Sequence, residues 1–181
     1  TVPLNNAVGG SLAVNGGTLT LNAAGTEAGS TSIGSGATLR LQANRSYGSG
    51  TSMAGAGTLD MVGGTISFTT GTSLGLAGTG NFTLTGALVD FSLGALTLAN
   101  GLSLTGGTLT GSSNITAATA TLTAGTLSGT GSLTTTGAVS VGDITLSRVW
   151  NAQGSTSLTA ANIVRLTNGT INNSGTWSLD G

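Results

Sequence analysis

A short strand motif returns in this sequence at a fixed spacing of 20 residues. The segment GTLTL at 17–21 recurs as ATLRL at 37–41 and as GTLDM at 57–61. The segment before it keeps the same step, since TSIG at 31–34 recurs as TSMA at 51–54. A repeat of this length, built from short strands and turns with no helical stretch, favours a solenoid of stacked parallel strands.

The local pattern between the repeats is also that of strands. Glycine and β-branched residues are too frequent for a stable helix. Asn-Gly and Gly-Gly pairs supply the turns, as at 15–17, 63–64 and 106–107. Pairs of apolar residues flank one small or polar residue, as strands with one buried side require, at 12–14, 19–21, 39–41, 59–61, 66–68, 74–76, 82–84, 96–98, 102–104, 139–141, 144–146 and 177–179.

We therefore predict an all-β fold, a right-handed parallel β-helix with coils of about 20 residues. Residues 1–181 would form a single β-helix domain or a segment of a longer one. Roughly nine coils at about 4.8 Å each give a body on the order of 40 Å long. A hairpin sandwich is the alternative, although it does not require the same strand to return at one spacing. Stacking would place four apolar side chains in one core column: Leu19, Leu39, Leu59 and Phe82.

The residue between the two inward positions of each repeated strand should point outward. The frame therefore aligns Thr20, Arg40, Asp60 and Thr83 in one outer column. Arg40 and Asp60 would be neighbours in this ladder and form an exposed ion pair. Such a pair contributes about 0–1 kcal/mol and would help to fix the register.

Composition argues against most classes of binding protein and enzyme. Only 5% of the residues are charged, with 4 Lys+Arg against 5 Asp+Glu and a net charge of -1. So few cations argue against nucleic acid and anionic membranes as partners. There is no His and no Cys, so the usual general base, thiolate nucleophile and zinc ligands are missing. No apolar run approaches the ~18 residues of a membrane span, while the 38% hydrophobic content argues against disorder.

The carboxylates offer no evident catalytic pair or metal site. They are scattered through the chain at Glu27, Asp60, Asp90, Asp143 and Asp180. A polysaccharide lyase or hydrolase on this scaffold would need several of them on one face. We therefore expect no enzymatic activity, no cofactor and no bound metal.

Two stretches resemble bacterial exoproteins. The segment GGTLTLNAAGTEAGSTSIGSGATLRL at 16–41 resembles the passenger-associated repeat of autotransporters. The region 106–179, with GGTLTGSSNITAATATLTAGTLSGTGSLTTTG and NGTINNSGTWSL, is similar to filamentous-haemagglutinin-like strand-repeat proteins. The resemblance implies a right-handed β-helix that acts outside the cell or on its surface as a stalk, an adhesin or a matrix component. It thus favours a secreted structural protein.

Two other functions remain open at this level. An adhesin could bind surface glycans by stacking Tyr47, Trp150 and Trp177 on sugar rings, although these residues are scattered and Trp177 alternates with Leu179 as an inward residue would. An ice-binding protein could use the Thr-x-Thr strands at 18–20, 108–110 and 121–123. We expect that lattice to be broken by the charged pair at 40 and 60, and by the irregular spacing of the repeat after residue 84.

The two ends of the sequence carry neither a charged nor a helical cap. A solenoid without caps exposes strand edges and a section of its core. We therefore expect either continuation of the same chain or self-association through open ends into a filament.

Overall fold

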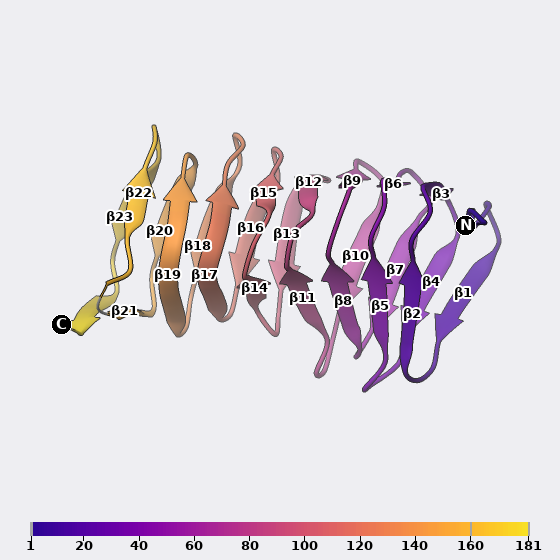
Figure 1. Ribbon diagram of the computed structural model, residues 1–181, viewed down its shortest axis with the longest axis horizontal. Helices are drawn as coiled ribbons and strands as arrows, with labels where there is room; N and C mark the ends of the chain where they lie inside the picture. The colour runs from indigo at the N-terminus through magenta and orange to yellow at the C-terminus, as the bar shows by residue number, and fades with distance from the viewer. Residues whose placement is uncertain (1, 160, 181) are drawn as a thin grey trace.

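The computed structural model describes residues 2–159 and 161–180, and every regular element in these ranges is a β-strand. The strands form a β-solenoid of about 8 turns. Figure 1 shows the windings side by side along one long axis, with β1 (Ser11–Val14) and β24 (Thr176–Asp180) at opposite ends. Every strand pair within the described ranges is parallel. The predicted fold class is therefore confirmed.

Each full coil contributes three strands, which stack into three faces. Face 1 consists of β2 (Thr18–Leu21), β5 (Thr38–Leu41), β8 (Thr58–Met61), β11 (Asn81–Leu84), β14 (Leu102–Leu104), the first halves of β17 (Ala120–Leu127) and β19 (Val139–Leu146), β21 (Ser155–Thr159) and β24. Face 2 consists of β3 (Gly25–Glu27), β6 (Arg45–Tyr47), β9 (Thr65–Thr69), β12 (Leu88–Ser92), β15 (Thr108–Thr110), the second halves of β17 and β19, and β22 (Val164–Leu166).

Face 3 is made of two separate parallel sheets. The first contains β1, β4 (Ser30–Ile33), β7 (Ser52–Gly55) and β10 (Ser73–Leu76). The second contains β13 (Ala95–Leu98), β16 (Asn114–Ala117), β18 (Ser132–Thr135), β20 (Val149–Ala152) and β23 (Thr170–Asn173).

The register of face 1 is continuous from the first coil to the last. Leu19 pairs with Leu39, Leu39 with Leu59, and Leu59 with Phe82, so these four side chains occupy one inward column. The same column then continues through Leu102, Ala120, Val139, Thr156 and Trp177. The apolar core therefore runs along the whole solenoid.

The irregular sequence spacing does not disturb this register. Along the column the step is 23 residues from Leu59 to Phe82 but only 17 from Val139 to Thr156. The strands nevertheless stay aligned residue on residue, because the corners between faces absorb the difference in length. The expectation that the lattice of outward residues breaks after residue 84 is therefore wrong.

Aromatic side chains also stack along the axis. Tyr47, Phe68 and Phe91 occupy successive inward positions of face 2, with ring centroids 4.6 Å and 5.1 Å apart. Trp150 lies in the core and contacts Trp177 at 5.5 Å. The three rings of face 2 are stacked because equivalent positions of neighbouring coils superpose, whereas Trp150 of face 3 and Trp177 of face 1 meet at a tilt of 51° across the core.

In the last coils, the corner between face 3 and face 1 is packed so closely that only glycine fits at Gly154 and Gly175. A Cβ atom on Gly154 would lie 2.0 Å from the carbonyl oxygen of Gly137, and one on Gly175 would lie 1.9 Å from that of Gly154. The glycines stack here because the backbones of successive coils approach each other without intervening side chains.

Candidate functional site

Arg40 and Asp60 form an ion pair on the outer side of face 1. They are neighbours in the ladder of β5 and β8, and Arg40 Nε donates to Asp60 Oδ2 at 2.9 Å. Their column includes Thr20 and Thr83. The pair is less exposed than we expected, since the Arg40 side chain is 43% exposed but that of Asp60 only 9%. The arginine lies beside the carboxylate and shields it from solvent.

A second ion pair, which the sequence did not reveal, is buried inside the first two coils. Arg45 points inward from β6 and binds Glu27 of β3, and the two side chains are 0% and 1% exposed. Arg45 Nη1 also donates to the carbonyl of Ala23 (3.1 Å), and Nη2 to that of Leu4 (2.6 Å). Gly25 makes room for the guanidinium, because a Cβ there would lie 2.9 Å from both terminal nitrogens.

Tyr47 is the core residue next to this pair. It is stacked on Phe68, 1% exposed, and its hydroxyl has no hydrogen-bond partner in the described ranges. Burial raises the pKa of the Tyr47 hydroxyl well above its ordinary value, and the nearby Arg45 guanidinium offsets this only in part. The group therefore stays neutral and acts as a core side chain.

Arg148 is a second buried cation, located where β19 turns towards β20. Its Nε donates to the carbonyl of Gly131 at 3.0 Å, and its Nη2 donates to the carbonyls of Ser113 and Ser132 at 3.0 and 3.2 Å. Burial lowers the pKa of this guanidinium to about 10. One side chain thus ties together the backbones of successive coils.

The remaining described carboxylates serve local structure. Asp90 accepts a hydrogen bond from Ser92 of the same strand, and Asp143 accepts one from the backbone N–H of Ile163 in the next coil. Among the residues that the structure describes, no group of three potential metal ligands comes together. These carboxylates are therefore not arranged as a metal centre.

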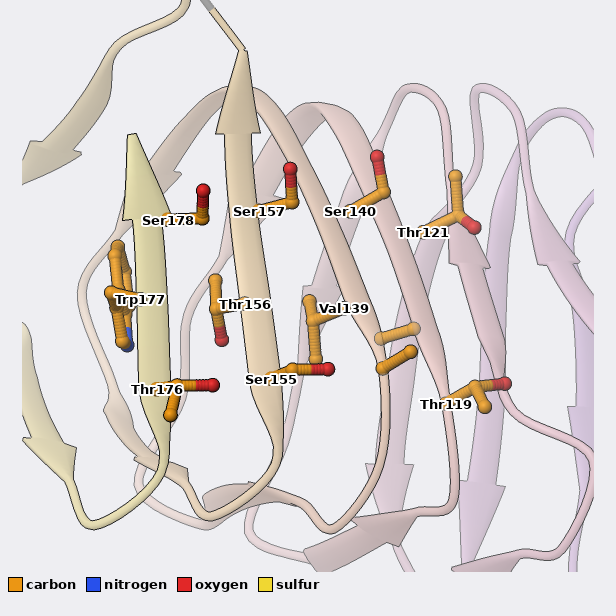
Figure 2. A pocket seen from close by; sticks show the side chains of 12 residues that line it. Thr119, Thr121, Val139, Ser140, Ser155, Thr156, Ser157, Thr176, Trp177 and Ser178 are labelled. Carbon is orange, nitrogen blue, oxygen red and sulfur yellow. The ribbon is translucent and has the colours of Figure 1, made fainter. Parts of the chain in front are cut away.

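The outer side of face 1 carries a groove, which we call the trough. It comprises two cavities, of about 500 and about 320 Å³, that share Thr119 and Thr121. Figure 2 shows two parallel rows of small side chains in the larger cavity, Thr121, Ser140, Ser157 and Ser178 in one row and Thr119, Ser155 and Thr176 in the other, with Val139, Thr156 and Trp177 between them. The smaller cavity extends the trough back to Thr58.

Hydroxyls on the outer side of the solenoid fall into two groups. Thr119 in the trough donates to the carbonyl of Asn100 in the preceding coil at 3.3 Å. Ser128 and Ser147, on the outer side of face 2, donate to carbonyls of the preceding coil at 3.4 and 3.5 Å. By contrast, no hydrogen bond to another described residue involves the side-chain hydroxyls of Thr121, Ser140, Ser155 and Ser157. These hydroxyls are available to a ligand or to water.

Comparisons with protein-family models, with curated proteins and with solved structures gave no match for this chain. Within the described ranges there is also no helix that could cross a membrane.

Proposed function

We propose that this chain is a structural element, a rigid β-solenoid that serves as a stalk, fibre or matrix component outside a bacterial cell. The observation that carries the proposal is the unbroken parallel register of face 1 from β2 to β24. Neighbouring coils are hydrogen-bonded along faces 1 and 2, and along face 3 within each of its two sheets. Such a stack resists bending and stretching because strain is shared among many bonds.

The surface chemistry supports a mechanical role rather than a catalytic one. The charged residues described above form ion pairs, as Glu27 and Arg45 do in the core, or hydrogen bonds to the backbone or, for Asp90, to a serine hydroxyl. The low charge of the chain also weakens the repulsion that keeps surfaces apart, which favours association.

Association of coils is part of the proposal. In the described part of the chain, Leu166 and Leu179 hold inward positions of the last windings but are 55% and 71% exposed. A further parallel coil, from the same chain or a second copy, would cover them. If the covering coil comes from a second copy of the chain, the protein should form filaments. Negative-stain microscopy and sedimentation at increasing concentration test this prediction.

Removing one coil is the sharpest test of the solenoid as a modular rod. Deletion of residues 83–102 joins Phe82 to Ser103 and keeps the inward–outward alternation of face 1. Because the chain has no cysteine, spin labels can be placed specifically at Thr20→Cys and Ser140→Cys. We expect the shortened protein to fold and the distance between the labels to fall by about 4.8 Å.

The matched control removes half a coil, residues 83–92, which destroys the alignment of all later coils. That variant should lose the structure after residue 82. An unfolded protein after removal of the full coil, or an unchanged label distance, would show that the coils are not independent units of length. Labelling of intact cells of the producing organism by an antibody against the chain tests the extracellular location.

A further inference from the structure

We propose that the trough on face 1 binds an unbranched, uncharged polysaccharide, with the glycan chain lying along the solenoid axis. This binding function goes beyond the mechanical role proposed above and does not depend on it. The proposal assigns face 1 to the binding of neutral polysaccharides.

The length and direction of the trough fit a linear polymer. Its two cavities join at Thr119 and Thr121, and together they extend over the windings from Thr58 to Thr176. Seven strands of face 1 contribute, so the trough is roughly 29 Å long at the usual spacing between parallel strands. A compact small molecule would fill only a fraction of this length, whereas an extended chain could occupy all of it.

The charge of the lining fits a neutral ligand. No charged side chain lines either cavity. Asp60, in the coil where the trough begins, is already paired with Arg40 at 2.9 Å. Uronic acids, sulfated glycans and phosphates would find no cation in the trough, so anionic polymers are disfavoured.

The hydroxyls of the trough match the chemistry of sugars. A Ser or Thr hydroxyl both donates and accepts, as a sugar hydroxyl does. The side-chain hydroxyls of Thr121, Ser140 and Ser157 form no hydrogen bond with another described residue. The Thr methyl groups and Ala138 add apolar surface for the C–H faces of the rings.

The continuous register makes the trough periodic. Ser140 pairs with Thr121 on one side and with Ser157 on the other, so equivalent hydroxyls recur once per coil. A repeating polymer can use such a series of weak contacts together, and its affinity then grows with chain length. The trough is hollowed, which suits a narrow chain better than the extended plane of an ice crystal.

Affinity electrophoresis of the full chain tests the proposal. Native gels would contain hydroxyethylcellulose, laminarin, dextran or soluble starch as neutral polymers, and polygalacturonate or heparin as anionic ones. We expect retardation by at least one neutral polymer and by neither anionic polymer. The retardation should stay nearly constant between about 0.05 and 0.5 M NaCl, because no ion pair forms.

Two matched variants locate the binding site. Ser140→Ile places a branched side chain in the trough, whereas Ser32→Ile makes the same change at an exposed outward position of β4 on face 3. Both keep a residue that favours strands, and circular dichroism would verify their folding. We expect Ser140→Ile to weaken retardation about tenfold or more, as filling a groove should, and Ser32→Ile to leave it unchanged.

Three results would overturn the proposal. They are the absence of retardation by every neutral polymer, retardation by the anionic polymers alone, and equal losses in the two isoleucine variants. Thermal hysteresis of the wild-type chain without glycan binding would assign the same face to ice instead and would also refute it.

Discussion

Replacing Arg45 by methionine should destabilise the first coils far more than replacing both members of the buried ion pair. Arg45→Met leaves the Glu27 carboxylate, 1% exposed, without its cation. It also removes the donors to the carbonyls of Ala23 and Leu4. Loss of one partner from a buried pair costs about 3–5 kcal/mol, because an uncompensated charge stays in the core.

The double variant Glu27→Leu/Arg45→Met removes both charges and keeps the volume apolar. We therefore expect the double variant to lie within about 1 kcal/mol of the wild type. Glu27→Leu alone should cost about 2–3 kcal/mol, because the guanidinium keeps its two carbonyl partners. The coupling energy between the two sites would then be at least about 4 kcal/mol.

Urea unfolding of all four proteins, followed by circular dichroism at pH 7, gives this double-mutant cycle. Solenoids can unfold in parts, so hydrogen exchange in residues 20–50 is measured as a local reading of the same free energies. Single variants that each cost less than about 1 kcal/mol, or a double variant as unstable as the sum of the two, would contradict a paired buried charge.

Tyr47→Phe removes a buried hydroxyl that has no partner in the described ranges and should raise the free energy of unfolding by about 1 kcal/mol at pH 7. Because the folded pKa of Tyr47 is raised, its contribution to stability is present below pH 10 and is lost as the pH rises further; the advantage of the variant in urea titrations should therefore widen above pH 10. Gly154→Ala would place a Cβ 2.0 Å from a carbonyl oxygen, whereas one at Gly75 meets no atom within 4 Å. The first change should cost about 2 kcal/mol or more and the second should stabilise by up to about 1 kcal/mol, and equal melting temperatures would refute the close packing of that corner. Arg40→Thr should cost about 1 kcal/mol or less, since the arginine is partly exposed, and a larger loss in denaturant titrations would show that Asp60 depends on this cation.

The 20-residue repeat was sufficient to predict which residues pair between the strands of the first coils. Leu19, Leu39 and Leu59 repeat at one spacing, and alternation along a strand decides which side chains point inward. Phe82 could be aligned despite its larger offset because its strand carries the same pattern. After residue 84 the sequence spacing no longer predicted the strand register, although the register itself continues. The physical reason is that the corners can vary in length, whereas the strands must stay paired.

The buried charges could not be recognised by residue type alone. Arg40 and Arg45 lie five residues apart, yet the first is outward on face 1 and the second inward on face 2. The burial of Arg45 is evident from its position in the strand ladder, because it pairs with the core residue Ile66 on one side and with Gly25 on the other. The trough could not be predicted from the sequence either, because its Ser and Thr residues come from coils that are no longer spaced by 20 residues.

Corners of variable length give this molecule a practical property as a display scaffold. A peptide inserted beside Gly36, where a side chain would meet no atom within 4 Å, would project from the second winding without altering the strands before and after it. Different peptides inserted at corners of different windings would then be held at known heights along one body. The same tolerance would let such proteins acquire new surface loops over evolutionary time while their core remains intact.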